Sequence, residues 1–437
     1  MFAGAAPSAR SVTAAGGGVK SGTVTRTAAP VQALTVETTP LDDIRPLIPF
    51  LDAHRPLLWQ RGGEGIAGVG EALRLEFSGP SRMADAAEAW RALAAAAAVS
   101  DPVGLPGTGL VAFGTFAFAD SSAATSVLIV PALIIGRHGG RAWLTRISTG
   151  DAASTAALPD PAPFGPEFHL TMASGELSAA AYGDAVATAV ERIAAESVRK
   201  VVLSRELRAE LPAGADLRRP LTELATGYPD CWTFAVDGFV GASPETLVRV
   251  LDGRIDAQVL AGTAARGTDD DTDATAAAAL ASSHKDLAEH AFAVDSVLEA
   301  LRPHTRDLVA GSPFTLRLPN LWHLATDVDG ELSDGCSALD LVDAMHPTAA
   351  VAGTPTPVAL AVIAELEPFD RGRYAGPVGW IGADGSGEWA VALRSAQVDG
   401  SGRVTAYAGG GIVADSDPVL EVAETTMKFR PIVEAFG

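Results

Sequence analysis

The sequence predicts an α+β fold, and three observations support this prediction. Segments with strand-like alternation and segments with helical spacing are mixed along the chain, which favours α+β layers over a doubly wound parallel sheet. The sequence contains neither a Walker A motif nor a GxGxxG motif after an expected strand. Hydrophobic residues make up 48% and charged residues 19% of the 437 residues, which is typical of a globular chain with a sizeable core.

We divide the chain into three segments. Residues 1–35 are rich in Ala, Gly, Ser and Thr and contain no acidic residue, so we expect a disordered tail. A transit peptide has a similar composition, but this segment lacks an apolar stretch and a clear amphipathic helix. The Pro-rich stretch 159–166 is typical of a linker. It separates an expected β-rich N-terminal part (36–165) from a larger domain (170–437).

The expected elements follow from local composition and periodicity. Alanine dominates 89–100, which predicts a helix. The apolar run 126–135 indicates a buried strand that pairs with 141–147 across a His-Gly-Gly turn. Beyond the linker, the patterns predict helices over 178–198, 284–302, 337–345, 356–367 and 418–435, strands over 200–207, 231–238, 246–250 and 321–328, and a hairpin within 377–398.

The net charge limits the classes of molecule that the protein is expected to bind. The chain has 32 basic and 53 acidic residues, a net charge of −21, which argues against nucleic acid or an anionic membrane as the main partner. A small anionic substrate remains compatible with a locally positive site. No apolar run approaches the roughly 18 residues of a membrane-spanning helix. Cys231 and Cys336 form neither a disulfide framework nor a metal motif, so we expect a cytoplasmic protein with reduced thiols.

Lysine is scarce, which draws attention to the lysines that are present. Only four basic residues are lysines (Lys20, Lys200, Lys285 and Lys428), and the rest are arginines. Arginine stays protonated, whereas a buried lysine can lose its proton because desolvation favours the neutral amine. Lys200 heads an apolar strand and is a candidate base. The alternative is an edge lysine that reaches water, which is the more frequent situation.

Two expected helices each carry a pair of carboxylates. Asp286 and Glu289 are three residues apart, as are Glu421 and Glu424, so each pair lies on one helix face. If the two pairs faced one another, the four carboxylates would repel unless a cation lay among them, and oxygen ligands suit a hard cation such as Mg²⁺. The alternative is two solvated helix faces, each near a lysine.

Three further positions are candidates for catalysis or for substrate binding. Glu245 follows a Ser-Pro turn and can act as a general acid if its pKa is raised, or it can simply begin a helix. Arg394 lies in an alternating strand, where an inward side chain needs an anion such as a carboxylate and an outward one is solvated. The glycines at 409–411 either present backbone N–H groups to a carboxylate or form a bulge.

The sequence positions of the histidines, serines and cysteines do not indicate a metal site or a catalytic nucleophile. His323 and His346 lack a third partner at metal-binding spacing, so we expect both to be structural or hydrogen-bonding residues. No serine stands in a nucleophile elbow, and no cysteine has a nearby histidine in sequence. Covalent catalysis therefore has little support.

Ten short motifs occur in an order that resembles the chorismate-utilising enzymes, which include isochorismate, salicylate, anthranilate and aminodeoxychorismate synthases. They are KVVLSR (200–205), SPE (243–245), AGTAARG (261–267), HKDLAEH (284–290), LWHLAT (321–326), HPTAAVAGTP (346–355), RYAGPVGW (373–380), ALRSA (392–396), AGGGIV (408–413) and ETTMK (424–428). The resemblance covers about 170–437 and is loose before residue 165. It implies the anthranilate synthase component I-like fold, with two stacked mixed or antiparallel sheets flanked by helices and a chorismate-binding catalytic domain at 170–437.

The resemblance also implies a magnesium site. Glu289 and Glu424 are the implied ligands of Mg²⁺, and Asp286 and Glu421 help directly or through water. The metal would neutralise the ring carboxylate of chorismate, with Lys428 nearby.

A second set of residues is implied to bind the rest of chorismate. Arg394 and Tyr374 resemble the ligands of the enolpyruvyl carboxylate, helped by the amides near Gly409. His323 and the Gly262–Thr263 turn are implied to line the ring pocket.

Within this family, the lysine at 200 and the absence of an amidotransferase segment favour isochorismate synthase, a Mg²⁺-dependent isomerase. Lys200 would take a proton from the water that attacks ring C2, and Glu245 would protonate the departing C4 hydroxyl, with no organic cofactor. The product would feed menaquinone or siderophore synthesis. We expect a monomer without an obligatory protein partner.

Three alternatives remain open. A salicylate synthase would also eliminate pyruvate, and this sequence resembles that branch at Tyr374 and Leu393, although the residues around 378–389 resemble isochorismate synthases. An ammonia-using anthranilate or aminodeoxychorismate synthase would need a separate amidotransferase. A homologue without catalytic activity would bind chorismate or metal without turnover.

Overall fold

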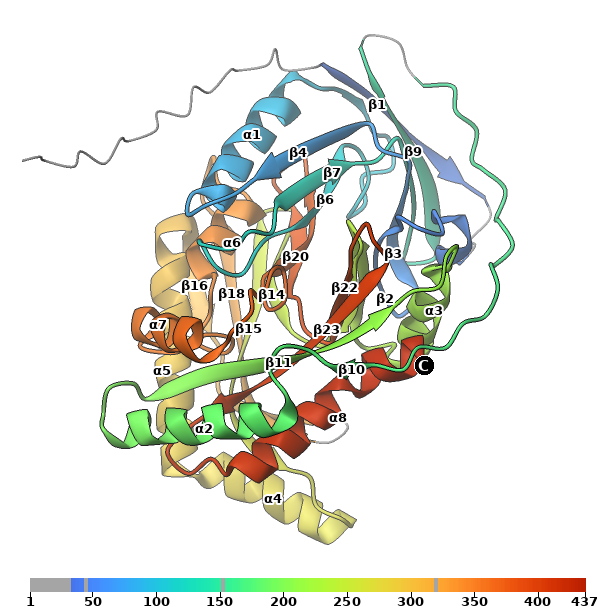
Figure 1. Ribbon diagram of the computed structural model, residues 1–437. Coiled ribbons are helices and arrows are strands. Elements are labelled where there is room, and N and C mark those ends of the chain that lie inside the picture. The colour runs from blue at the N-terminus through green and yellow to red at the C-terminus, as the bar shows by residue number, and fades with distance from the viewer. Residues whose placement is uncertain (1–32, 43–45, 151–153, 318–320) are drawn as a thin grey trace, which may run out of the picture. The chain divides into compact units, whose positions relative to one another are not determined.

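The computed structural model describes residues 33–42, 46–150, 154–317 and 321–437, apart from the side chains of a few residues within elements. The expected tail at 1–35 falls almost wholly outside these residues. Within them the chain forms two large sheets with helices packed against them, which confirms the predicted α+β class (Figure 1). No helix among the described residues is long and apolar enough to cross a membrane.

The first sheet has antiparallel neighbours throughout, except for one parallel pair at its edge, β1 with β5. In spatial order its strands are Ala173–Ser174 (β10), Lys200–Glu210 (β11), Arg403–Ile412 (β23), Ser395–Val398 (β22), Phe239–Ser243 (β13), Trp232–Val236 (β12), Leu57–Arg61 (β2), Glu64–Val69 (β3), Leu133–His138 (β8), Arg141–Thr149 (β9), Leu34–Leu41 (β1) and Ala98–Ser100 (β5), and Gly353–Thr354 (β19) pairs with β11.

The second sheet is antiparallel between its paired neighbours. Its strands are Thr305–Ala310 (β16), Leu321–Leu332 (β18), Arg254–Ala265 (β15), Thr246–Leu251 (β14), Gly387–Val391 (β21), Pro377–Gly382 (β20), Val111–Thr115 (β6), Ser126–Val130 (β7) and Leu73–Phe77 (β4), and Phe314–Arg317 (β17) pairs with β18. Strands from 36–165 and from 170–437 occur in both sheets, for example in the β2–β12 and β6–β20 pairs.

The helices lie on the outer faces of these sheets. They are Arg82–Ala96 (α1), Ala179–Ala194 (α2), Arg218–Gly227 (α3), Asp270–Ser282 (α4), His284–Leu301 (α5), Ala338–Met345 (α6), Thr356–Leu366 (α7) and Pro418–Phe436 (α8), with short 3₁₀ turns at Ile48–Phe50 (η1) and Arg302–His304 (η2). Helices α2, α3, α7 and α8 contact the first sheet, and α4, α5 and α6 contact the second (Figure 1). The face of each sheet that the helices do not cover packs against the other sheet.

The main core lies between the two sheets. Large aromatic side chains of the first sheet, such as Trp59, pack in one cluster with those of the second, such as Trp380 and Trp389. Two of these indoles share one acceptor, because Nε1 of Trp59 and Nε1 of Trp380 each donate to Oε2 of Glu388 at 3.1 Å. Burial raises the pKa of Glu388, and these two hydrogen bonds oppose that effect. The shared carboxylate therefore joins the two layers.

Helix α8 packs on the outer face of the first sheet because its apolar residues recur at helical spacing. Phe429, Ile432 and Phe436 are buried there in one apolar cluster with strand residues of β23. Burial of each such side chain stabilises the fold by about 1.5–3 kcal/mol. This packing fixes the direction in which the opposite side of α8, with its carboxylates, must face.

Two predictions in the N-terminal part are wrong in detail. The run 126–135 is not one strand, because the chain turns at Pro131 and divides it into β7 in the second sheet and β8 in the first. Proline lacks the N–H that a continuous ladder requires. The alanine-rich helix is α1, which begins at Arg82 and ends at Ala96; residues 98–100 pair with β1 instead of continuing the helix.

The other expected elements are confirmed. The hairpin across His138 and Gly139 is formed by β8 and β9. All five predicted helices of the second part and its predicted strands are present, with ends that differ by a few residues. The predicted hairpin at 377–398 is the β20–β21 pair, and its last residues belong to β22 in the other sheet.

Candidate active site

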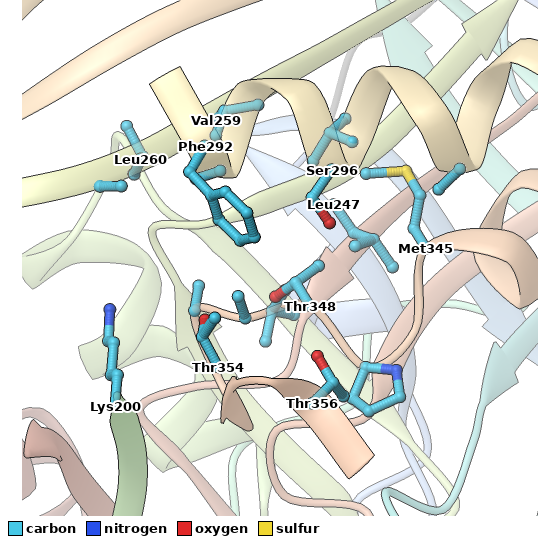
Figure 2. A pocket seen from close by; sticks show the side chains of 18 of the residues that line it. Lys200, Leu247, Val259, Leu260, Phe292, Ser296, Met345, Thr348, Thr354 and Thr356 are labelled. Atoms are coloured by element: carbon cyan, nitrogen blue, oxygen red, sulfur yellow. The ribbon is translucent and has the colours of Figure 1, made fainter. Parts of the chain in front are cut away.

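A cavity of about 690 Å³ lies where β11, β14, β15 and α5 meet the segment around 344–350. Lys200 and Glu245 both line it, although they are far apart in sequence. Figure 2 shows Lys200 extending from β11 at one side of this pocket, with Phe292 projecting into it from α5. The candidate base and acid thus share one chamber, as the proposed chemistry requires.

The position of Lys200 follows from the pairing of β11. Lys200 lies opposite Thr354 of β19, and the neighbouring residue Val201 lies opposite Ile412 of β23. The lysine side chain crosses Gly411, where an added Cβ would come within 3.0 Å of the lysine Cε. Glycine at this position therefore provides the space through which the side chain reaches the cavity.

A buried ion pair fixes the strand that carries Lys200. Glu367, at the end of α7, accepts hydrogen bonds from the backbone and the hydroxyl of Ser204 and from Arg371. Arg371 also donates to the carbonyls of Val202 and Val351, at 2.7 and 3.0 Å. All these polar groups are thereby satisfied, and the pair joins β11 to the cavity-lining segment that ends near Val351.

Glu245 is held at the junction of the two sheets. It lies between β13 and β14, so the predicted alternative of a helix start is wrong. Its N–H donates to Oγ of Ser243, and its carbonyl accepts from the N–H of Val391. The side chain keeps some accessible surface because it faces the cavity, but protein surrounds it. Burial raises the pKa of Glu245, and the positive charges of Arg394, Lys200 and Lys428 oppose this shift.

Arg394 points inward rather than to solvent. Its backbone has a φ of +47°, in the left-handed region, at the break between β21 and β22. Burial lowers its pKa, and Tyr374, Cys231, Glu245 and Glu424 oppose the shift. Within the described part of the chain, the guanidinium makes no hydrogen bond or ion pair. A half-buried guanidinium that has no partner among the described side chains is suited to bind an anion.

Tyr374 lies beside Arg394. Its ring is 4% exposed and stacks on the ring of Tyr407, with centroids 5.2 Å apart. Burial raises the pKa of Tyr374 to about 12, so its hydroxyl remains a hydrogen-bond donor at neutral pH.

Helix α8 brings Glu421, Glu424 and Lys428 to the same region. Nζ of Lys428 lies 2.5 Å from Oε1 of Glu424 and donates to the carbonyl of Gly409 at 2.8 Å. Burial lowers the pKa of Lys428, and Glu424 opposes the shift. Gly409 thus contributes its carbonyl oxygen as the acceptor for this amine.

The carboxylate of Glu421 tests whether these residues fit a metal ion. Its Oε1 accepts from Ser416 Oγ at 2.8 Å, while its Oε2 is buried without a hydrogen-bond partner in the described structure. Burial, together with the charge of Glu424, raises the pKa of Glu421. A buried carboxylate oxygen without a donor needs a cation or a proton. The α8 pair therefore fits a hard divalent cation.

The second predicted pair is placed only in part. Asp286 lies in the first turn of α5, where its N–H is capped by Ser283, and its Cβ lies 3.4 Å from the position of a Cβ added to Gly262. The side chains of Glu289 and Thr263 lie outside the described residues. Among the side chains that are described, no group of three or more His, Cys, Asp or Glu comes close enough to hold a metal.

His323 adjoins the same region. It pairs with Thr263 in the β15–β18 ladder, and its Nδ1 lies 3.4 Å from the carbonyl of Gly262. Burial lowers the pKa of His323, and the positive charges of Lys428, Lys200 and Arg394 lower it further. The other singled-out histidine, His346, lines the cavity and contacts the carbonyl of Phe118 through Nε2 at 2.9 Å. Burial lowers the pKa of His346 to about 4, so it is neutral at physiological pH.

Several residues around the site were not singled out from the sequence. Tyr407 supports Tyr374, the Glu367–Arg371 pair supports β11, and Arg199 and Phe292 line the cavity. The position of Arg199 directly before Lys200 was the available signal. Nothing in the local pattern around Phe292 distinguishes it from a core residue of α5.

Comparisons with known proteins identify the family to which the chain belongs. The family model described as chorismate binding enzyme matches residues 26–437, and the chain therefore belongs to the chorismate-binding enzyme family. It is 40% identical to isochorismate synthase DhbC of Bacillus subtilis over 269 residues, which are 59% of this chain and 67% of that protein. It is 33% identical over 434 residues to the salicylate biosynthesis isochorismate synthase of Pseudomonas aeruginosa, covering 93% of this chain and 90% of that protein.

A solved structure shows the same fold. The structure of MenF, the menaquinone-specific isochorismate synthase from Escherichia coli, matches with a TM-score of 0.76 and 26% identity, covering 92% of this chain and 95% of that chain. The predicted family and its fold of two sheets flanked by helices are thereby confirmed.

Proposed function

We propose that this protein is an isochorismate synthase, an isomerase that converts chorismate into isochorismate. The observation that carries the proposal is the shared cavity of Lys200 and Glu245, because the reaction needs a base and an acid at one substrate. The similarity to isochorismate synthases over most of the chain supports the same activity.

The two groups divide the proton transfers. Lys200, as the base, removes a proton from the water that attacks ring C2, and the carboxylic acid of Glu245 donates a proton to the C4 hydroxyl as it leaves as water. The raised pKa of Glu245 suits a proton donor, because burial keeps the acid form populated at higher pH than in a free glutamate. One water enters and one leaves, so the isomerisation is balanced without a redox step.

The cationic side chains bind the two carboxylates of chorismate. Arg394, a half-buried guanidinium without a partner among the described side chains, and the hydroxyl of Tyr374 hold the enolpyruvyl carboxylate. Lys428, whose Nζ donates to the carbonyl of Gly409, would lie near the ring carboxylate. His323 and Gly262, with Thr263, line the ring pocket. Binding both carboxylates fixes the ring relative to Lys200 and Glu245.

Magnesium is part of the proposal. Glu424 and Glu421 of α8, together with Glu289 and Asp286 of α5, would hold the ion. When bound, Mg²⁺ would neutralise the ring carboxylate and so complete the substrate site. The orphaned oxygen of Glu421 supports this assignment from the protein's own residues.

We also propose the setting of the reaction. The isochorismate would feed the synthesis of menaquinone or of a siderophore, in the cytoplasm and with the enzyme as a monomer that needs no obligatory protein partner. A solved relative named as menaquinone-specific supports the first pathway. A relative named for salicylate biosynthesis shows that isochorismate synthases also serve other pathways.

The direct test is the product profile of the purified protein with chorismate. We expect isochorismate with Mg²⁺, a loss of at least tenfold in rate when EDTA is in excess, and recovery when excess Mg²⁺ is added. Without the ion, the carboxylates proposed as its ligands would face the unneutralised ring carboxylate of the substrate. Chromatography resolves the products.

Other products would contradict the proposal in distinct ways. Salicylate with pyruvate would identify a salicylate synthase, and anthranilate or aminodeoxychorismate in the presence of ammonium would identify an ammonia-using enzyme. Binding of chorismate without any product would indicate a homologue without catalytic activity.

A further inference from the structure

The cavity wall differs in charge from the rest of the protein. The chain has 53 acidic residues, yet the only charged side chains that line this cavity in the described structure are Arg199, Lys200 and Glu245. Burial favours the uncharged acid of Glu245. The chamber is therefore positive inside a protein with a net charge of −21, and low-dielectric walls focus such a potential.

Arg199 is held at this cavity by contacts that leave its charge available. Its N–H donates to the carbonyl of Thr354 at 2.8 Å, which fixes the backbone. Its Cζ lies 4.7 Å from the centroid of the Phe292 ring, and that ring is 49% exposed. The Arg199 side chain is exposed and makes no hydrogen bond or ion pair with any described residue. Stacking on Phe292 orients the guanidinium without neutralising it.

The roles proposed for Lys200 and Glu245 leave Arg199 as the source of a lasting positive charge at the cavity. A base at Lys200 must be neutral, and an acid at Glu245 must be protonated, when the substrate arrives. Arginine keeps its charge at any ordinary pH. Arg199 is then the permanent cation among the described residues that line the cavity.

We propose that Arg199, oriented by Phe292, is a substrate-capture residue that draws the dianionic substrate through the exposed side of the cavity. This inference rests on the proposed function, because it takes a dicarboxylate such as chorismate as the substrate. Arg199 acts on the approach of the substrate and on its first binding, not on the bond changes at the ring. Its loss therefore affects kcat/KM and leaves kcat unchanged.

The test compares two exposed arginines, Arg199 directly before β11 of the first sheet and Arg254 at the start of β15 in the second. Arg199→Gln removes the charge at the cavity, and Arg254→Gln removes one from the far end of β15, which does not line it. We measure isochorismate formation between about 20 mM and about 500 mM salt. At low salt, Arg199→Gln is expected to lower kcat/KM about three- to tenfold relative to Arg254→Gln, with kcat unchanged.

Salt and a charge-retaining variant sharpen the result. The difference between the two variants should shrink at high salt, where screening shortens electrostatic reach to a few ångströms. Arg199→Lys should retain most of kcat/KM at low salt, and Arg199→Glu should lose more than Arg199→Gln. Far-UV circular dichroism and the Tm of each variant establish that the fold is kept.

Two outcomes would overturn the inference while the proposed function stands. One is wild-type isochorismate synthesis with equal kcat/KM for Arg199→Gln and Arg254→Gln at every salt concentration. The other is a fall in kcat for Arg199→Gln that does not respond to salt, which would indicate a role in the chemical step. Failure of the proposed function is separate, since the wild-type protein would then form no isochorismate.

Discussion

Replacing Lys200 by alanine is expected to lower kcat for isochorismate formation by about 10²- to 10⁴-fold, the usual contribution of a positioned base. Water is a poor nucleophile, and the only other ionisable groups on the described cavity wall are Glu245, which is needed in its acid form, neutral His346 and permanently charged Arg199. KM should change less, because Arg394 and Lys428, which are proposed to bind the two carboxylates of chorismate, remain in place. Steady-state kinetics with chorismate and Mg²⁺ measures both parameters.

A second substitution separates a base from a mere positive charge. Lys200→Arg keeps a cation at the head of β11 but cannot supply a neutral amine. We expect it to be as inactive as Lys200→Ala. If Lys200→Arg retains more than about a tenth of the wild-type kcat, an electrostatic role would replace the assigned one.

Replacing Glu245 by glutamine is expected to lower kcat by a similar factor, about 10²- to 10⁴-fold, because the amide cannot protonate the departing hydroxyl. Glu245→Asp should retain part of the activity, since it keeps the acid but withdraws it from the C4 oxygen. The matched control is Glu210→Gln, at the exposed end of β11. Kinetics of all three variants under the same conditions gives the comparison.

Glu245→Gln should also stabilise the folded protein. Burial raises the pKa of Glu245 in the folded state, so the folded protein binds this proton more tightly than the unfolded chain. Stability from this group is present at low pH and is lost as the pH rises through the folded-state pKa. At neutral pH or above, Glu245→Gln should therefore raise the Tm while activity falls. A lower Tm together with lower activity would point to a structural role instead.

Much of the fold could be predicted because the second part has strong local signals. Periodicity located α5 and α8, and alternation located the strand that begins at Lys200. Alternation also placed Arg394 within a strand, which is wrong, because Arg394 lies between the end of β21 and the start of β22. The N-terminal part was harder, because a single apolar run such as 126–135 does not reveal that Pro131 sends its halves into different sheets.

The candidate site was predicted as a set of residues more readily than as an arrangement. Motif order grouped Lys200, Glu245 and Arg394, but local sequence left the inward direction of Arg394 undecided, because it depends on a left-handed backbone between two sheets. The ion pair of Glu367 with Arg371 was not foreseen, since it connects α7 to β11 through three-dimensional packing. Sequence alone does not separate a role for Arg199 from that of Lys200, because the two residues are adjacent and the motif assigns its chemistry to the lysine.

The most direct measurement follows the origin of the new hydroxyl. The wild-type protein is incubated with chorismate and Mg²⁺ in H₂¹⁸O, and early isochorismate is analysed by mass spectrometry. Water activated by Lys200 must deliver one ¹⁸O atom to C2, so the product should be heavier by the mass of one label. Unlabelled isochorismate would mean that the C4 hydroxyl had migrated within the substrate, and it would contradict the roles given to both Lys200 and Glu245.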